Sequence, residues 1–342
     1  MPDADRVLPP TTKDLARAAG VSRATVDRVL NGRLGVRQAT VDRVNQAIRD
    51  LGFVRNMAAA NLAKGRSYRF VHLLPSSGDL FLEELERCIA EAARFSADRL
   101  VTDIRRIDAN DPHAVARDLA ALGAEGCDGV ALMAPRSPPV RDAIARLDDA
   151  GVPVIPFVSS QGGSFVGIDD RAAGATAGLL MGRFAGAGSG SVLVLSETMT
   201  AQDSLNRRLG FDAILAARFP ALRVPASLET YGDPDRTRAV LSRAVAGRPD
   251  LRGLYVLSSE ARVPLDVLGG MDLPRDLVVI AHERTAATVA ALLDGRVSAI
   301  ITQDPGHLAR SVLRRLKALS DGREVFAAQE RIRTEILLET NL

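Results

Sequence analysis

The sequence predicts a small all-α headpiece followed by an α/β region built from two doubly wound parallel-sheet subdomains. Three short amphipathic helical patterns fill residues 10–56, and from residue 69 onward short β-branched runs alternate with segments of helix length. The chain has 342 residues, which is too many for one compact core. We therefore expect several domains.

The headpiece is predicted from its turn and capping residues. Thr11 or Thr12 can cap a first helix, Gly20 permits a tight turn, and Ser22 can cap a second helix that stops at Asn31-Gly32. A third helix is expected over 38–51. Two helices joined by a glycine turn and followed by a third are typical of a helix-turn-helix, which places its second helix in the major groove of DNA.

The distribution of charge agrees with this interpretation. Residues 1–67 contain 12 Lys and Arg against 6 Asp and Glu, a balance of +6, whereas the remainder has 44 − 12 = 32 against 42 − 6 = 36, a balance of −4. A basic first segment on a mildly acidic body is typical of a nucleic-acid-binding arm, although a solvated basic surface has the same composition.

The remaining residues alternate between strands and helices. Strands are expected at 69–74, 100–107, 128–133, 153–157, 191–195, 253–257, 277–281 and 297–302. Helices are expected at 79–96, 112–123, 137–150, 169–185, 202–217, 233–246 and 305–320. Apolar strands in this alternation indicate parallel sheets covered on both faces, in which ligands bind beyond the carboxyl ends of the strands.

The first segments resemble the headpiece of the LacI family of repressors. The resemblance runs through TTKDLARAAGVSRATVDRVLNG, VRQATVDRVNQAIRDLGFVRN and AAANLAKGRS. It implies a DNA-binding headpiece at 10–56 and a hinge helix with linker at 57–67, in which Leu62 wedges into the minor groove. The DNA-contacting residues that it implies are Thr12, Ser22, Arg23, Ala24, Thr25, Asp27, Arg28, Asn31, Arg37, Asn56 and Leu62.

Two headpiece positions depart from the family pattern. Asp27 stands where the family usually has Ser, and a carboxylate repels phosphate but can accept from a cytosine amino group. Arg37 replaces the Ser that usually caps the third helix. We therefore expect an altered half-site, a weaker cap and one more phosphate contact.

The rest of the chain resembles the periplasmic-binding-protein-like type I effector domain of LacI regulators. Segments such as LLPSSGDLFLEELE, FVGIDDRAAGATAGLLMGRF and AIITQDPGHLARSVL carry the resemblance, which covers nearly all of 68–342. It implies an N-subdomain over about 68–165 and 302–325 and a C-subdomain over about 166–301 and 326–342. Three chain crossings, near 158–168, 282–303 and 323–331, would form a hinge around a cleft.

The resemblance also implies which residues bind the effector. They are Asp79, Phe81, Pro135, Arg136, Asp169, Arg207, Glu283 and Gln303. Carboxylates accept hydroxyl protons, Arg donates to oxygens and an aromatic ring packs against a sugar, so the set suits a sugar or polyol. Arg136 and Arg207 together can also hold a phosphate or carboxylate, which leaves a sugar phosphate or sugar acid open.

The function predicted from these features is a transcriptional repressor that a sugar-like effector releases from operator DNA. A stand-alone sugar receptor is the alternative. We expect no enzyme, because nucleophile-elbow and phosphate-loop motifs are missing. We expect no cofactor and no metal, because the four histidines lack paired-ligand spacing. The absence of a heptad run after Leu338 favours a homodimer. Two cysteines and no leader or membrane segment favour a cytoplasmic protein.

Overall fold

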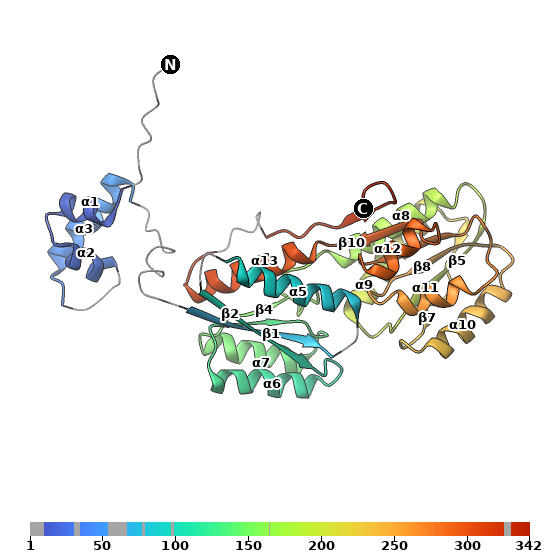
Figure 1. The fold of residues 1–342 in the computed structure, drawn as a ribbon, viewed down its shortest axis with the longest axis horizontal. Coiled ribbons are helices and arrows are strands. Elements are labelled where there is room, and N and C mark those ends of the chain that lie inside the picture. The colour runs from blue at the N-terminus through green and yellow to red at the C-terminus, as the bar shows by residue number, and fades with distance from the viewer. Residues whose placement is uncertain are drawn as a thin grey trace, which may run out of the picture. The chain divides into compact units, whose positions relative to one another are not determined.

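A computed structural model of the protein describes residues 10–30, 35–53, 67–76, 79–96, 99–163, 165–324 and 330–342. The chain divides into two compact units, Met1–Arg66 and Ser67–Leu342, and each is described by itself (Figure 1). The described residues of the first unit form helices, and those of the second combine helices with two sheets.

Three helices form the first unit: α1 (Thr12–Ala19), α2 (Arg23–Leu30) and α3 (Gln38–Leu51). Thr11 is the N-cap of α1 and forms a capping box with Asp14, so Thr12 is the first helical residue. Gly20 ends α1 at φ +61°, a left-handed conformation that suits glycine, and its N–H donates to the carbonyls of Ala16 and Arg17. The predicted glycine turn between the first two helices is confirmed.

A small apolar core holds these helices together. Leu15, Val26 and Val44 come from the three helices and are each 0% exposed, and Phe53 closes the cluster after α3. Since one fully buried aliphatic side chain contributes about 1.5–3 kcal/mol, a few such residues suffice for a unit this small. Leu51, the last residue of α3, is 37% exposed, whereas Ala47 is buried.

The second unit begins with a parallel sheet in the order β2-β1-β3-β4. Its strands are β1 (Ser67–Pro75), β2 (Arg99–Ile107), β3 (Gly129–Leu132) and β4 (Val154–Pro156). The helices that pack on it are α5 (Leu80–Arg94), α6 (Pro112–Glu125), α7 (Pro138–Asp149) and α13 (Pro305–Ser320). Alternate residues of β1 face opposite helical layers, so that Phe70 and Leu74 belong to one core cluster and Val71 and Leu73 to another.

A second sheet has the order β11-β10-β9-β8-β5-β6, with β7 also paired to β5. Its strands are β5 (Gly190–Ser196), β6 (Leu222–Arg223), β7 (Leu228–Glu229), β8 (Leu251–Val256), β9 (Val278–His282), β10 (Ala299–Thr302) and β11 (Glu335–Leu337). The accompanying helices are α8 (Asp170–Phe184), α9 (Gln202–Arg218), α10 (Pro234–Ala246), α11 (Arg262–Gly269) and α12 (Ala286–Leu293). Every neighbouring pair is parallel except β10–β11, which is antiparallel.

The two sheets confirm the predicted α/β fold, and all predicted strands and helices are present within about two residues of their expected ends. The sequence pattern did not predict α11, α12, β6, β7 and β11. These elements have two to eight residues, too few to establish a period. In the described ranges, no helix combines the length and the apolar character needed to cross a bilayer.

Candidate functional site

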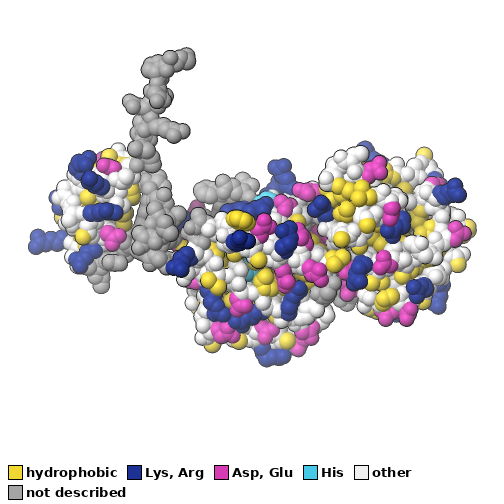
Figure 2. Space-filling view, in the orientation of Figure 1, with side chains coloured by type: hydrophobic (Ala, Val, Ile, Leu, Met, Phe, Trp, Pro, Cys, Tyr) yellow, Lys and Arg dark blue, Asp and Glu magenta, His cyan; other side chains and the backbone are white. Residues whose placement is uncertain are grey.

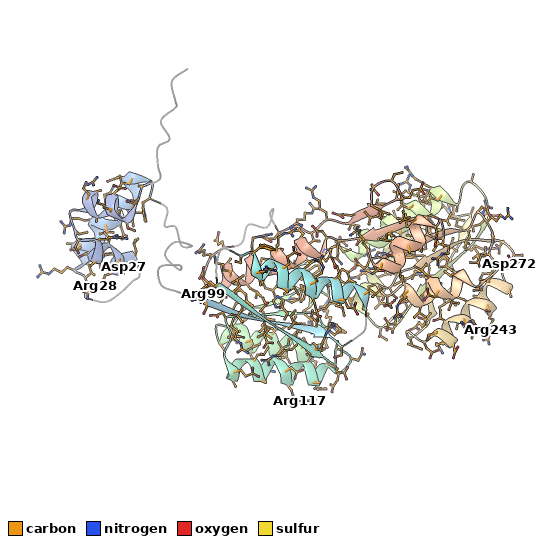
Figure 3. All side chains as sticks on the ribbon, in the orientation of Figure 1. Asp27, Arg28, Arg99, Arg117, Arg243 and Asp272 are labelled. Atoms are coloured by element: carbon orange, nitrogen blue, oxygen red, sulfur yellow. The ribbon has the colours of Figure 1, made fainter. Side chains whose placement is uncertain are left out.

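The second helix of the headpiece presents the predicted DNA-contacting side chains. The Ser22 hydroxyl accepts a hydrogen bond from the Thr25 N–H at 3.1 Å, which confirms the predicted N-cap of α2. Arg23, Ala24 and Arg28 are exposed while Val26 on the opposite side is fully buried. Asp27 and Arg28 lie at the surface of the headpiece (Figure 3). One face of α2 is therefore available to a partner.

Positively charged side chains also lie near the start of α3. Arg37 is the N-cap residue of α3, is exposed and makes no side-chain capping hydrogen bond. This agrees with the weaker cap that we expected where Arg37 replaces the usual Ser. Thr12 and Thr25 are half-buried. On the face of the headpiece seen in Figure 2, Lys and Arg side chains outnumber acidic ones. The predicted contacts Asn31, Asn56 and Leu62, and with them the hinge helix, lie outside the described residues.

In the second unit, side chains at the carboxyl ends of several strands form a buried polar network around Arg207. Arg207 is 3% exposed. Its Nε donates to Asp170 Oδ1 at 2.9 Å, its Nη1 donates to the Leu257 carbonyl at 2.9 Å, and its Nη2 lies 3.5 Å from Glu283 Oε1. Asp170 begins α8, Leu257 follows β8 and Glu283 follows β9. One guanidinium thus joins three elements.

Close contact between two helices places Arg207 beside Asp170. A Cβ atom on Gly210 of α9 would lie 1.9 Å from the Arg171 carbonyl oxygen, and one on Gly174 of α8 would lie 1.9 Å from the Arg207 carbonyl oxygen. Only glycine permits this approach. The α8–α9 contact therefore brings the start of α8 against the middle of α9, and Asp170 reaches Arg207.

Glu283 is the most constrained member of the network. It has φ +61°, which is rare for a side chain of this kind, and its own backbone groups bond to the Ile301 carbonyl and the Thr288 hydroxyl. Its carboxylate accepts from Thr302 Oγ1 and from Gln303 Nε2, each at 3.2 Å. Burial raises the pKa of Glu283 to about 7, although Arg207 and these donors favour the ionised form.

A hydrogen bond connects the loop after β8 to the first sheet. The Ser259 hydroxyl, after β8, donates to Asp79 Oδ2 at 2.7 Å, and Asp79 follows β1. Asp79 also caps α5, since its Oδ1 accepts from the Phe81 N–H at 2.8 Å. The carboxyl ends of both sheets therefore meet at Asp79 and Ser259, the position that a ligand occupies in open parallel sheets.

Two further carboxylates stand next to this contact. Glu197 follows β5, and its backbone N–H donates to Ser258 Oγ at 2.6 Å. Glu260 follows Ser259 directly. The pKa values of Glu197 and Glu260 are raised by burial and by the negative charge of Asp79.

We refer to the whole set as the strand-end cluster. Its members are Asp79, Asp170, Glu197, Arg207, Ser259, Glu260, Glu283 and Gln303.

Three of the predicted effector-binding residues belong to this network, namely Arg207, Glu283 and Gln303. Asp79 bonds to Ser259, which follows by two residues the Leu257 carbonyl that Arg207 contacts. The others lie elsewhere. Phe81 is 2% exposed and packs in the core. Asp169 caps α8 and, together with Asp170, lines a groove of about 780 Å³. Arg136 and Pro135 are exposed, and the Arg136 guanidinium packs against Gly162.

Sequence reasoning missed Asp170, Glu197, Ser259 and Glu260. A signal for Asp170 was available in the pair Asp169-Asp170, because an N-cap side chain turns back to its own helix and leaves the next residue free to point inward. The other three follow β5 and β8, where the sequence contains ordinary Ser and Glu in loops. Nothing in their spacing distinguishes them.

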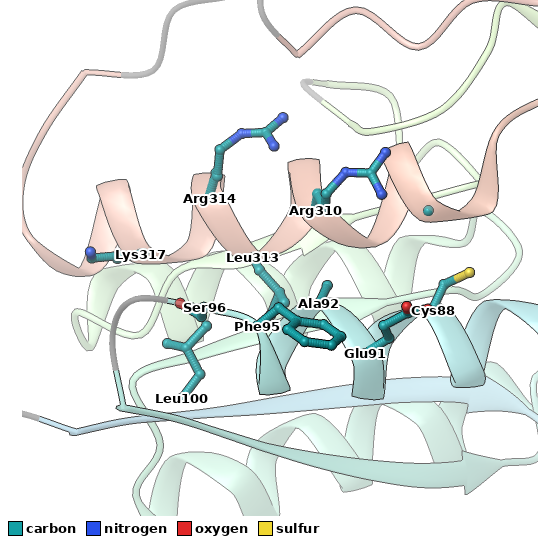
Figure 4. Close-up of a pocket in the computed structure, with 11 residues that line it drawn as sticks. Cys88, Glu91, Ala92, Phe95, Ser96, Leu100, Arg310, Leu313, Arg314 and Lys317 are labelled. Carbon is teal, nitrogen blue, oxygen red and sulfur yellow. The ribbon is translucent and has the colours of Figure 1, made fainter.

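Two grooves border these elements. One of about 830 Å³ reaches Gln303 and is also lined by Leu80, Glu83 and Arg284. Another, of about 400 Å³, runs between α5 and α13, where Figure 4 shows Phe95 and Leu313 between the two helices. Phe95 is 74% exposed. Among the described residues, no three His, Cys, Asp or Glu side chains are grouped so that they could hold a metal ion.

Comparison with known proteins agrees with both units. The family model described as bacterial regulatory proteins, lacI family, matches residues 11–56, and the periplasmic binding protein domain matches residues 70–324. The regulator GntR of Pseudomonas aeruginosa is 42% identical over 78 residues, which are 22% of this chain and 23% of that protein. The chain covers about a quarter to a third of the first curated relatives that it matches.

Solved structures share the fold of the second unit. A solute-binding protein of Burkholderia graminis in complex with D-arabinose has a TM-score of 0.70 at 21% identity, covering 80% of this chain and 96% of that one. A putative LacI transcriptional regulator of Bacteroides fragilis has a TM-score of 0.70 at 19% identity, covering 81% and 98%. The chain belongs to the periplasmic binding protein domain family, whose model matches residues 70–324, and its residues 11–56 match the lacI family model.

Proposed function

We propose that this chain is a DNA-binding transcriptional regulator, a repressor that leaves its operator when a small sugar-like effector binds at the strand-end cluster. The observation that carries the proposal is the presence in one chain of a helix-turn-helix with an exposed recognition face and a two-sheet unit with polar side chains at facing strand ends. A stand-alone sugar receptor has no use for the first of these.

In this proposal α2 enters the major groove. Arg23 and Arg28 are its two exposed cations, and an Arg side chain can donate two hydrogen bonds to guanine. Arg37 at the start of α3 supplies a phosphate contact. Asn31 and Asn56 and the Leu62 wedge complete the interface that the family resemblance implies.

The effector-binding side chains in this proposal are Asp79, Arg207, Glu283 and Gln303, joined by Asp170. Their oxygens and N–H groups match the hydroxyl groups of a sugar. We assign Phe81, Pro135, Arg136 and Asp169 to the edge of the site or to its support. Binding of one ligand to groups that follow β1, β8, β9 and β10 would fix the two sheets relative to each other.

We also propose that the chain acts as a homodimer in the cytoplasm. Operators that are read by two helix-turn-helix units require two copies of α2. Large apolar side chains are available for self-association, since Phe95 is 74%, Val101 57% and Leu293 62% exposed. Sedimentation velocity of the full chain at micromolar concentration measures whether the dimer forms.

The test of the function is a band shift with DNA from the promoter next to the gene. Removing the Arg28 side chain eliminates one base contact, which typically costs about 1–3 kcal/mol. We expect Arg28→Ala to weaken operator binding by at least about tenfold, while sugar binding measured by calorimetry is unchanged. Arg243→Ala, in α10 of the second unit, serves as the control. Equal operator affinity for Arg28→Ala and the parent would contradict the assignment of α2.

A further inference from the structure

The strand-end cluster contains many more acidic than basic side chains. Its carboxylates are Asp79, Asp170, Glu197, Glu260 and Glu283, and the charge of Asp203, one turn before Arg207 on α9, also acts on Asp170, Glu197 and Arg207. The cations that reach them are Arg207 and Arg262, whose Nε lies 3.8 Å from Glu260 Oε1.

The positive charge of Arg207 is already compensated inside the protein. Asp170 and Glu283 lie at 2.9 Å and 3.5 Å from its guanidinium, and the Leu257 carbonyl takes a third N–H. An anionic ligand would have to compete with two buried carboxylates for this one cation. A phosphate or carboxylate therefore finds no free counter-charge at Arg207, and it would meet the negative field of Asp79, Glu197 and Glu260.

Within the described part of the chain, the carboxylates around Asp79 have one cation beside them, Arg262, which is half exposed and lies 3.8 Å from Glu260 Oε1. The negative charges of Asp79, Asp203 and Glu260 act together on Glu197. Asp79 is 8% exposed, and Oδ2 accepts from the neutral Ser259 hydroxyl. Charges of one sign on facing strand ends repel one another, and a bound cation would relieve that repulsion.

An independent observation is a buried hydrogen-bond acceptor without a partner. Gln303 is 1% exposed, and its Nε2 donates to Glu283 Oε1 at 3.2 Å, which fixes the orientation of the amide. Its Oε1 has no hydrogen-bond partner. Because the amide group contacts Glu283, this oxygen adds an acceptor to the same network. Buried acceptors without partners are rare in folded proteins, and a donor group of a bound ligand can complete this one.

We propose that the effector is a polyol that carries a protonated amine, of the amino-sugar or amino-polyol class. The inference rests on the function proposed above and restricts the effector to one chemical class. An ammonium group has three donors and no acceptor, so it matches carboxylate and amide oxygens, and its hydrogen bonds to carboxylates are charge-assisted. The remaining hydroxyl groups of the ligand bind Arg207 and Glu283. The class excludes sugar phosphates and sugar acids.

The test uses hexoses that differ in a single charged group. Calorimetry of the full chain at pH 7 compares D-glucosamine and D-galactosamine with D-glucose and D-galactose, with the two uronic acids and with the two 6-phosphates; 1-amino-1-deoxy polyols extend the amine set. We expect at least one amine to bind about tenfold or more tightly than its neutral counterpart, and the acids and phosphates to bind more weakly than either. The preference should fall as salt is added.

Two variants test whether the strand-end cluster causes the preference for amines over neutral sugars. Glu197→Gln and Glu260→Gln keep the shape of the side chain and remove one charge each, so each should lower the amine-to-neutral affinity ratio by about threefold to tenfold. Asp235→Asn is the matched control, because the Asp235 side chain is 96% exposed on α10. Since Glu197 and Glu260 are partly exposed, these variants are expected to fold, and melting curves check this.

Three results would overturn the inference: equal binding of neutral and amine sugars, tighter binding of an acid or phosphate, and binding by none of the amine probes. Band shifts on the same preparations separate this failure from failure of the proposed function. An operator complex that responds to a neutral or anionic sugar rejects only the amine. The absence of any specific DNA complex rejects the regulator itself.

Discussion

Arg207 determines the electrostatics of the strand-end cluster, because it is the buried cation between Asp170 and Glu283. Arg207→Ala would leave two buried carboxylates without a counter-charge. Removing one partner of a buried ion pair typically costs about 3–5 kcal/mol. We therefore expect a large loss of unfolding free energy in urea, before any effect on effector binding can be measured.

A double-mutant cycle separates the ion pair from the loss of packing. Asp170→Asn combined with Arg207→Met should be less destabilising than the sum of the two single variants. The reason is that Arg207→Met alone leaves two buried carboxylates without a cation, whereas the double variant leaves only one. Additive free energies would show that Arg207 contributes by packing alone.

His72 gives the first sheet a dependence on pH. It is 0% exposed on β1, neither ring nitrogen has a hydrogen-bond partner, and burial lowers its pKa from 6.5 to about 4. Between these values the unfolded chain binds a proton that the folded chain does not bind. The unfolding free energy therefore falls as the pH falls from about 6.5 to 4, by about 3 kcal/mol at most.

His72→Leu removes this contribution. We expect the difference in unfolding free energy between pH 7 and pH 4.5 to be smaller in the variant by about 2–3 kcal/mol, measured by urea titration at both pH values. Other groups also titrate in this range, and the comparison of variant with parent cancels them. The same pH dependence in both proteins would mean that His72 is protonated in the folded state.

The role of an individual side chain was predictable only where it depends on residues next to it in the sequence. Ser22 and the missing cap at Arg37 could be predicted because capping depends on a few adjacent residues. The capping pattern of Asp169-Asp170 indicated that Asp170 points inward, but not its partner, because Arg207 is 37 residues away. Phe81 fits an aromatic ligand contact in the sequence, but the first turn of α5 directs it into the core instead.

At the level of elements, the predictable features are those with a repeated period. The long helices α5, α8 and α13 and the apolar strands of both sheets follow from periodicities of 3.6 and 2. The short β6, β7 and β11 depend on pairing with β5 and β10, which is decided by contacts far along the chain. The residues of these short strands therefore do not indicate which strand they pair with.

The α8–α9 contact is the element on which the position of Arg207 depends. Gly210→Ala would place a Cβ atom 1.9 Å from the Arg171 carbonyl, so the helices must separate. We expect a loss of about 1–3 kcal/mol or more in unfolding free energy, as in other overpacked cores. Gly247→Ala is the control, since that residue ends α10 at φ −81° and its nearest contact would be at 3.5 Å. Equal melting temperatures for the two variants would contradict this account of the contact.

For the whole second unit, the hydrogen bond from Ser259 to Asp79 is the link between the carboxyl ends of the two sheets at the proposed effector site. A ligand that binds the strand ends of both sheets fixes the two sheets relative to each other. In our proposal this change releases DNA. A coupling between two sites is reciprocal and commonly amounts to about 1–3 kcal/mol. The factor by which effector weakens operator binding must therefore equal the factor by which operator weakens effector binding.

Ser259→Ala tests this link. It removes a hydrogen bond of about 0.5–1.5 kcal/mol that favours the arrangement in which the two strand ends touch. If that arrangement releases DNA, the variant needs about twofold to tenfold more effector for half-release, while its operator affinity without effector is equal or higher. Fluorescence anisotropy of labelled operator, titrated with a sugar that calorimetry shows to bind, measures both quantities. Ser227→Ala is the control, since the Ser227 hydroxyl accepts a hydrogen bond from Arg208 Nη1 and neither residue belongs to the strand-end cluster. A lower effector requirement in Ser259→Ala would mean that contact between Asp79 and Ser259 belongs to the DNA-binding state, and the direction of the proposed switch would be reversed.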